Sequence, residues 1–143
     1  MDLKIHLVDD TLPMPAYQTP GAVGFDLYAR ENTTIPARSF GLVPSNLIVH
    51  VPPGHGFFVF SRSGTPKKKG LIVGNGVGIV DQDYCGPEDE IKILFYNTKD
   101  EPVTVERGER CAQAAIIAVA KVDFVKHTPS KTSRGGFGST GTK

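Results

Sequence analysis

The sequence predicts an all-β fold, and three observations lead to this prediction. Glycine and proline supply 27 of the 143 residues, 16 and 11 respectively, which interrupts the chain too often for long helices. Only residues 109–128 run for twenty residues without either type. Several short runs alternate between apolar and polar side chains, as strands with one buried face do. The chain length is that of one domain with a sizeable core.

The first half of the chain contains a series of expected strands between proline- and glycine-rich turns. They are predicted at residues 3–7, 23–28, 40–43, 47–51 and 56–60. His6 falls on the polar side of its run, so we expect a solvated surface histidine. Asp26 lies on the face opposite Val23, Phe25 and Leu27, and a single aspartate on a polar face is usually solvated.

The next segment, Ser61-Arg62-Ser63-Gly64, combines hydroxyl, guanidinium and glycine groups. This composition at the end of a strand, with a single helical turn after it, suits an oxyanion or phosphate. The lysines at 67–69 are expected to form a solvated basic loop. Residues 111–120 contain alanines that permit a helix, but also Ile116, Ile117 and Val119, which suit a strand buried on both faces. Periodicity leaves both alternatives open there.

Residues 74–92 contain the densest recognition chemistry. The alternating runs 77–80 and 91–96 flank an acidic turn, which is typical of a β-hairpin. Asp81 and Asp83 either cap local backbone donors in that turn or act in a binding site. In a site, Tyr84 would pack on a sugar or base, and Asn75 would pair with a polar edge. A hairpin open between its arms can also present main-chain groups to a base, and glycines at 74, 76, 78 and 86 permit close approach.

Composition argues against several classes of protein. The net charge of +1 produces no global attraction to nucleic acid or membrane. No apolar run approaches the roughly 18 residues of a membrane span, and residues 1–4 do not begin a signal peptide. Cys85 and Cys111 are too few for a disulfide framework. We therefore expect a soluble cytoplasmic protein without nucleic-acid or membrane partners.

The C-terminal segment differs from the rest of the chain. From residue 127 to residue 143 it has one aromatic side chain, Phe137, among small, polar and basic residues, so it cannot bury enough surface to order itself. Residues 134–141 nevertheless combine a cation, an aromatic ring and two hydroxyls among glycines. Such a segment could fold over a nucleotide. We expect a domain at 1–127 and a flexible tail at 128–143.

Five segments together resemble the trimeric dUTP diphosphatase (dUTPase) family, in the family's order. They are GAVGFDLYA at 21–29, SRSG at 61–64, GNGVGIVDQDYCG at 74–86, ERGERCAQAAI at 106–116 and RGGFGSTG at 134–141. The resemblance implies a jelly-roll-like β-barrel and a homotrimer with an exchanged C-terminal strand and sites at subunit interfaces. It also implies Mg²⁺-dependent hydrolysis of dUTP to dUMP and pyrophosphate, which supplies dUMP for thymidylate synthesis and keeps uracil out of DNA.

The resemblance also implies roles for individual residues. Asp81 matches the carboxylate that activates the water attacking the α-phosphate, Tyr84 the residue under the deoxyribose, and Asp26 a residue near the water shell of the metal. The residues that match base-reading groups are Asn75, Gly78, Ile79, Val80 and Lys92. Those that match phosphate contacts are Arg62, Ser63, Gly64 and Gln113. In the tail, the residues assigned to the substrate are Arg134, Gly136, Phe137, Gly138, Ser139 and Thr140, with Phe137 as the lid over uracil.

The sequence departs from the family pattern at three places. Ser61 stands where proline is common, and about three extra residues follow Gly86. Arg134 lies three residues before Phe137 instead of five, so Lys131 is an alternative for the tail cation. Three rival functions are a dCTP deaminase, a nucleotide-sensing binding protein and a general triphosphatase. The deaminase would need a glutamate near the position of Asp81.

Overall fold

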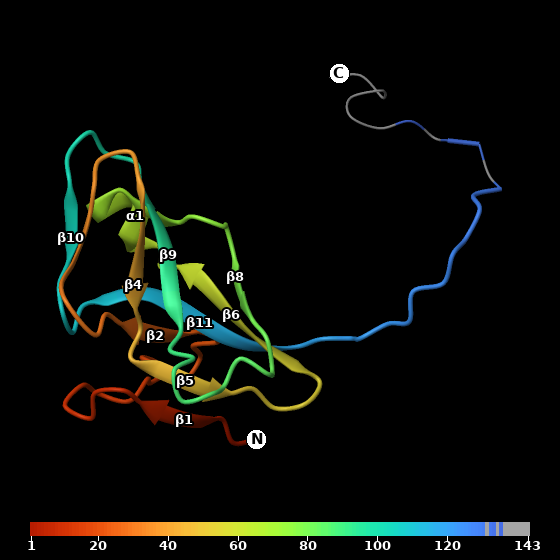
Figure 1. Cartoon of the computed structure of the whole chain (residues 1–143), viewed down its shortest axis with the longest axis horizontal. Helices are drawn as coiled ribbons and strands as arrows, with labels where there is room; N and C mark the ends of the chain where they lie inside the picture. Colours follow the sequence, from red (N-terminus) through yellow and green to blue (C-terminus); the bar gives the residue numbers. More distant parts are fainter. Residues whose placement is uncertain (131, 134, 136–143) are drawn as a thin grey trace.

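The computed structural model describes residues 1–130, 132, 133 and 135. Within these residues the chain forms eleven strands and one short helix, so the all-β prediction is confirmed (Figure 1). The elements are β1 (Lys4–Leu7), β2 (Phe25–Tyr28), β3 (Thr33–Ile35), β4 (Phe40–Pro44), β5 (Leu47–His50), β6 (His55–Ser61), α1 (Gly64–Lys69), β7 (Leu71–Val73), β8 (Gly78–Val80), β9 (Lys92–Asn97), β10 (Val103–Val105) and β11 (Arg110–Ala118).

The strands of the described chain form four separate sheets. In the largest, β11 pairs with β2 on one edge and β6 on the other, and β8 pairs with β6. In the next, β9 lies between β4 and β7, while β1 pairs with β5 and β10 with β3. These ladders do not join into a closed ring, so the chain does not form the closed barrel that was expected. Four of the strands are only three residues long, too short to bridge one sheet to the next.

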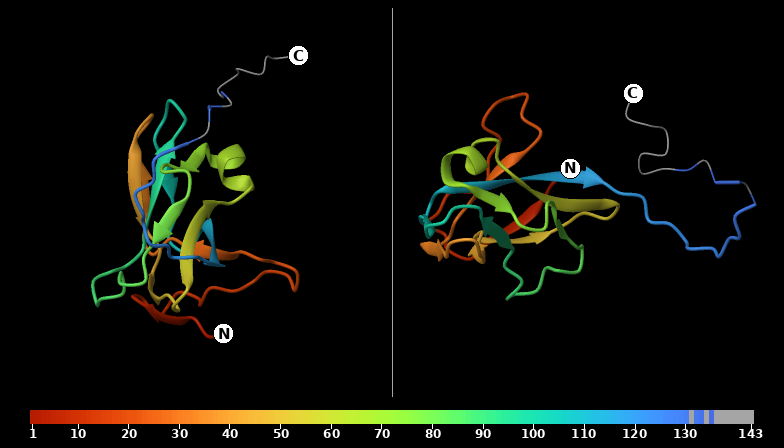
Figure 2. Two further views of the ribbon diagram at one scale, coloured as in Figure 1. Left: turned by 90° about the vertical axis from the view of Figure 1, so that its right-hand side faces the viewer. Right: turned by 90° about the horizontal axis from the view of Figure 1, so that it is seen from above.

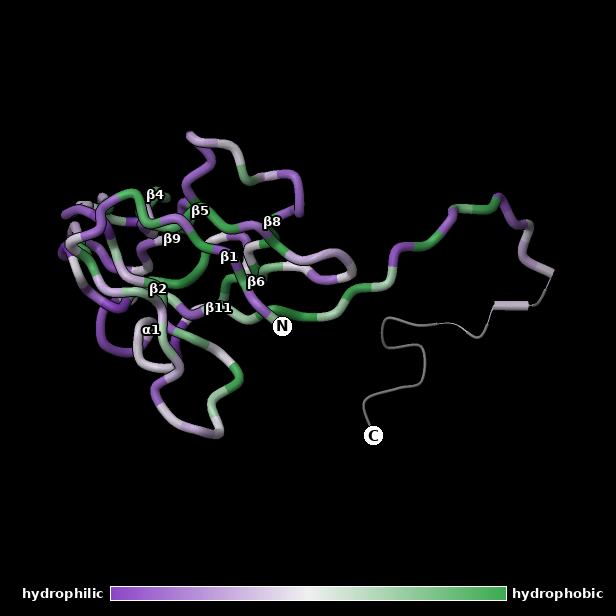
Figure 3. The backbone as a smooth tube through the Cα atoms, turned by 90° about the horizontal axis from the view of Figure 1, so that it is seen from below, coloured by the Kyte–Doolittle hydropathy of each residue, from purple (hydrophilic) through white to green (hydrophobic). Residues whose placement is uncertain are grey.

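The two larger sheets share one hydrophobic core. Phe57 on β6 and Phe95 on β9 are both fully buried, and Phe25 packs edge-to-face on Phe57 with ring centroids 5.8 Å apart. Figure 3 shows how hydrophobic stretches alternate with hydrophilic connections along the chain. Because side chains alternate between the two faces of a strand, the apolar positions of each alternating run meet in this core.

Most predicted strands are present, with ends shifted by a few residues. Residues 111–120, where helix and strand were both open, lie mostly in β11, which has hydrogen-bonded neighbours on both edges. The strands β3, β7 and β10 were not predicted, because three residues are too few to establish an alternation. The predicted single helical turn is the six-residue α1. It ends at Gly70, whose φ of +69° is the left-handed conformation that glycine adopts easily.

The two arms of the predicted hairpin belong to different sheets. β8 pairs with β6, whereas β9 pairs with β4 and β7. The long connection from 81 to 91 does not force the two strands together, as a tight two-residue turn would. A hydrogen-bonded hairpin is therefore the wrong prediction, and among the described residues no strand pairs with the edge of β8 that faces the start of β9.

Beyond β11 the described residues carry neither helix nor strand, and the segment up to residue 130 runs away from the sheets in Figure 1 and in the right-hand view of Figure 2. Its apolar side chains Val122, Phe124 and Val125 are exposed. The tail residues assigned to the substrate, and Lys131, lie outside the described residues. No helix in the described part of the chain is long and apolar enough to cross a membrane.

Cys111 should resist thiol reagents in the folded protein, whereas Cys85 should react. Cys111 is buried, and burial together with the charge of Glu109 raises the pKa of its thiol to about 12. The thiolate is the reactive form, and Cys85 is partly exposed. A disulfide-reagent titration should therefore modify one thiol per chain rapidly without denaturant, and both in urea. The control variant Cys85→Ser should show no rapid reaction; rapid reaction of this variant would contradict the burial of Cys111.

Candidate active site

A buried carboxylate joins β2, β6 and β11. Asp26 is only 6 % exposed; its Oδ1 forms an ion pair with Arg62 Nε at 2.7 Å, and its Oδ2 accepts a hydrogen bond from Arg110 Nη1 at 3.2 Å. Arg62 Nη1 also donates to the Arg110 carbonyl at 2.9 Å. The expectation that Asp26 is solvated is therefore wrong, because an ion pair and a charge-assisted hydrogen bond replace the contacts with water.

The register of β11 places the polar groups on this side of the molecule. Gln113 is paired with Asp26 on β2 and with Phe60 on β6. A register shift between Arg110 and Ala112 is typical of a β-bulge, which redirects a side chain. The Gln113 amide donates to the Ser61 carbonyl at 3.0 Å, so at least one donor of this amide is satisfied within the chain.

The basic residues around α1 line a cavity of about 250 Å³. Arg62, Ser63 and Gly64, all predicted phosphate contacts, lie on its wall with Lys68 and Arg110. Lys69 donates to Glu109 Oε2 at 2.6 Å, so the expected solvation of the lysine run is wrong for this residue. The remaining guanidinium and ammonium groups give the cavity the chemistry of an anion site.

Ser61 has a structural role that proline could not fill. Its hydroxyl oxygen accepts a hydrogen bond from the Val73 amide at 2.9 Å. This contact joins the end of β6 to the end of β7, immediately before the glycine-rich turn that leads into β8. The departure from the family pattern at this position thus adds a bond between two strands that border the candidate site.

A second cavity, of about 100 Å³, lies between β8 and the start of β9. An added Cβ at Gly78 would lie 3.0 Å from the Cβ of Val59, so a larger residue would displace β8 from β6. On the opposite edge, β8 has main-chain groups that no described strand occupies. The structure brings together here all the predicted base-reading residues: Asn75, Gly78, Ile79, Val80 and Lys92.

Asp81 follows directly after β8. Both Asp81 and Asp83 are exposed and line a third cavity, of about 400 Å³, which shares Ile79 and Val80 with the second one. In the described part of the chain neither carboxylate accepts a hydrogen bond from a backbone amide, so turn capping does not explain them. The turn is closed instead by the Tyr84 amide, which donates to the Asp81 carbonyl at 3.3 Å.

Side chains around this turn were missed by reasoning from the sequence. Gln82 donates to the carbonyls of Pro52 and His55 at 3.2 and 2.9 Å, which ties the turn to the loop before β6. The Tyr84 hydroxyl donates to the Glu90 carbonyl at 3.3 Å. Arg110 was also missed. The only indication of its role in the sequence was its place within the run ERGERCAQAAI. A glutamine in a polar turn carries no sequence signal of this role.

The described residues offer no metal cage. No group of three or more His, Cys, Asp or Glu side chains among them could hold an ion. Mg²⁺ commonly keeps several waters and binds through one or two carboxylates and substrate phosphates. Each oxygen of the Asp26 carboxylate contacts one guanidinium group and has a further lone pair. The donor set therefore suits an outer contact through water.

Sequence comparison gives consistent matches over the whole chain. The dUTPase family model matches residues 10–141. A deoxyuridine 5′-triphosphate nucleotidohydrolase of Shewanella oneidensis is 39 % identical over 151 residues, covering 100 % of this chain and 97 % of that protein. The protein of the same description from Shewanella baltica is 36 % identical over 152 residues, with the same coverage of both chains.

Solved structures share the fold. The dUTPase from Streptococcus mutans has a TM-score of 0.78 at 33 % identity, covering 84 % of this chain and 98 % of its own. A dUTPase mutant of Staphylococcus bacteriophage 80alpha bound to dUpNHpp has a TM-score of 0.79 at 22 % identity, covering 98 % of both chains. A mutant dUTPase of phage phi11, which coordinates a structural Mg(II) ion, has a TM-score of 0.78 at 17 % identity, covering 90 % of this chain and 98 % of its own.

Asp26→Asn should lower the free energy of unfolding by about 1–3 kcal/mol, because it leaves the guanidinium groups of Arg62 and Arg110 without their charged acceptor. Urea unfolding without nucleotide or metal measures this loss, and a role limited to the metal's water shell would leave it unchanged. The control Asp100→Asn breaks the exposed ion pair of Asp100 with Arg38 and should leave the unfolding midpoint unchanged. If both variants and the parent have equal unfolding midpoints, the contacts of Arg62 and Arg110 with Asp26 do not stabilise the fold.

Proposed function

This chain belongs to the dUTPase family and is an enzyme that hydrolyses dUTP, and we propose that Asp81 is the general base of the reaction. The observation that carries this assignment is the position of Asp81. It directly follows β8, the strand whose open edge borders the candidate base cavity. Its carboxylate is exposed and forms no ion pair within the described chain, so it is available to a water molecule.

In the proposed reaction a water oxygen attacks the α-phosphorus of dUTP while its proton passes to the Asp81 carboxylate. The bond between the α-phosphorus and the bridging oxygen breaks, which releases dUMP and pyrophosphate. A general base of this kind contributes roughly 10²–10⁴-fold to the rate. The exposed Asp83, two residues further on, lies on the same cavity and provides a matched position at which the same substitution should do little.

Uracil is proposed to bind between β8 and the start of β9. The main chain of Gly78, Ile79 and Val80 and the amide of Asn75 then pair with its polar edge, with Lys92 opposite. The unpaired edge of β8 and the small cavity support this assignment. Cytosine presents the opposite donor and acceptor pattern, and sites built to pair a polar edge reject such mismatches strongly. A 5-methyl group would overpack the cavity.

The deoxyribose is proposed to pack against Tyr84, and the phosphates to contact Arg62, Ser63, Gly64 and Gln113. The anchoring of Arg62 by Asp26 supports its role, because a fixed guanidinium group binds phosphate oxygens at a smaller entropic cost. The tail residues Arg134, Gly136, Phe137, Gly138, Ser139 and Thr140 are proposed to close over the nucleotide, and the tail to begin at residue 128. Arg134 is preferred to Lys131 as the phosphate ligand because its planar fork binds oxygens in pairs.

Mg²⁺ is the proposed cofactor, held mainly by the triphosphate, with Asp26 in contact through water. When bound, the ion supplies positive charge that neutralises the phosphates. Arg62 supplies the same kind of charge from the protein side. Each Asp26 oxygen is oriented by a guanidinium group and keeps a lone pair that can accept a hydrogen bond from a water of the ion, which supports this assignment.

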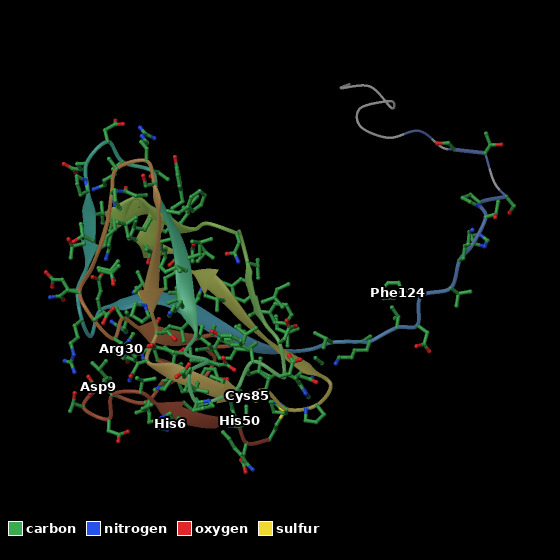
Figure 4. All side chains as sticks on the ribbon, viewed as in Figure 1. His6, Asp9, Arg30, His50, Cys85 and Phe124 are labelled. Atoms are coloured by element: carbon green, nitrogen blue, oxygen red, sulfur yellow. The ribbon has the colours of Figure 1, made fainter. Side chains whose placement is uncertain are left out.

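The active assembly is proposed to be a homotrimer with exchanged C-terminal strands. Three observations support it. The predicted site residues of one chain line separate cavities. The sheet of β4, β9 and β7 exposes Phe40, Leu42 and Ile72, an apolar set that another copy would cover. The segment after β11 carries Phe124 well away from its own domain (Figure 4), 97 % exposed.

Asp81→Asn should fold and bind nucleotide but lose at least about 10²-fold in kcat, because it cannot accept the proton of water. Pyrophosphate release from dUTP with Mg²⁺ measures the loss, and the same assay with EDTA tests the metal. The matched control Asp83→Asn should retain kcat within a few fold. A crippling effect of Asp83→Asn together with a mild effect of Asp81→Asn would assign the base to the other carboxylate.

The parent protein should be a trimer by light scattering, about three times the chain mass of 15.4 kDa. Leu42→Glu should dissociate it and abolish dUTP hydrolysis, because a buried unpaired charge is costly at an interface. The control Val8→Glu alters an exposed apolar residue on another part of the surface and should leave the mass unchanged. A fully active monomer would refute a site shared between subunits. A Leu42→Glu variant that stays trimeric would show that the interface lies on another face.

A further inference from the structure

Behind the turn that carries Tyr84 lies a buried ion pair whose function the reaction above does not include. Glu90 is 7 % exposed. Its two carboxylate oxygens accept hydrogen bonds from Arg30 Nε at 2.8 Å and Arg30 Nη2 at 3.0 Å, and Oε1 also accepts from the Asn46 amide at 2.8 Å. A bidentate pair with a third, backbone donor fixes the carboxylate in both position and orientation. Figure 4 shows Arg30 close to Asp9, at the end of the molecule where β1 and β5 lie.

The residues before Glu90 direct it inward. The Asp89 carboxylate accepts a hydrogen bond from the Gly86 amide at 2.7 Å, and the Asp89 amide donates to the Gly86 carbonyl at 3.0 Å. These two bonds close residues 86–89, the extra segment of this chain, into a turn. After it, the Ile91 amide donates to the Leu47 carbonyl at 2.8 Å. Glu90 is thus held on both sides before β9 begins.

Asn46 joins this ion pair to the N-terminal part of the chain. Its φ of +69° is a left-handed conformation that asparagine tolerates better than most residues. Its side chain accepts from the Asp9 amide at 2.7 Å and donates to the Asp9 carbonyl at 3.0 Å. The backbone amide that reaches Glu90 therefore belongs to a residue that is itself fixed, so the carboxylate is bound to a rigid support.

The main chain of Glu90 transmits this rigidity to Tyr84. The Tyr84 hydroxyl donates to the Glu90 carbonyl at 3.3 Å, and the Tyr84 amide donates to the Asp81 carbonyl at 3.3 Å. Tyr84 is therefore tied at one end to the residue that follows β8 and at the other end to the residue before Ile91. The ring itself is 40 % exposed, so packing alone does not determine its orientation.

We propose that Arg30 and Glu90 are positioning residues, which hold the Tyr84 ring through the Glu90 carbonyl and thereby set the discrimination between deoxyribose and ribose. The proposal rests on the proposed function, in which Tyr84 packs against the sugar. A fixed ring leaves no space and no partner for a 2′-hydroxyl. A ring released from the carbonyl can turn away, which admits the hydroxyl without changing the base cavity or Asp81.

The test is the ratio of kcat/KM for dUTP to kcat/KM for UTP. Tyr84→Phe removes only the hydroxyl, and Glu90→Gln keeps the size of the side chain while it weakens the bidentate pair. Each should lower the ratio by roughly 2- to 12-fold, the effect of one hydrogen bond, mainly by improving the use of UTP. Because the two changes act through the same bond, the double variant should lower the ratio no further than either single variant does.

Two further variants distinguish the possible outcomes. Arg38→Gln breaks the exposed pair with Asp100 at 2.8 Å, on the loop between β3 and β4, and should leave the ratio unchanged. If Tyr84→Ala leaves the ratio unchanged, the assignment of Tyr84 to the sugar fails. If Tyr84→Ala lowers the ratio but Tyr84→Phe and Glu90→Gln do not, the positioning role alone is overturned. If Glu90→Gln fails to fold, Tyr84→Phe still decides, because its ring is exposed.

Discussion

The pairing of β11 with β2 on one edge and β6 on the other fixes most of the polar groups on the proposed phosphate side of the site. Its register sets Gln113 beside Asp26, and the shift after Arg110 lets that guanidinium group reach the same carboxylate. Because β6 also carries β8, a displacement of β11 would move the base cavity as well. One buried carboxylate and one ladder therefore hold the candidate anion cavity and the candidate base cavity of the chain in relation to each other.

The opposite side of the site depends on an edge that stays unpaired. Among the described strands β8 pairs only with β6, and the start of β9 is held by the β4–β5 turn through Ser45, Leu47 and the carboxylate of Glu90. Each strand is supported from behind, so the space between them persists without a ligand. A preformed opening reduces the ordering cost of binding. The local hydrogen bonds within the connection from 81 to 91 help to keep this opening in place.

Much of this arrangement could be predicted from the sequence, because alternation sets which residues face the core. The acidic turn, Asn75 and the serine–arginine–serine–glycine segment could be singled out by residue type, but spacing alone left turn capping open for Asp81 and Asp83, and it was the resemblance to the family motifs that implied their roles. The burial of Asp26 could not be found, since its partners Arg62 and Arg110 are distant in the chain. Glu90 and Arg30 were missed for the same reason: a pair 60 residues apart leaves no periodic signal.

The unpaired edge of β8 has a further consequence, for the solubility of the protein. An exposed strand edge can template pairing with a strand from another molecule, the first step of edge-to-edge aggregation. Two features of the chain limit that risk: β8 is only three residues long, and the charged Asp81 follows it directly. The edge is thus long enough for the proposed pairing with uracil and too short to pair stably with a strand of another molecule. Gly76, two residues before β8, has a φ of +76°, a left-handed conformation that β-branched residues do not adopt without strain, so the turn also keeps β8 from extending.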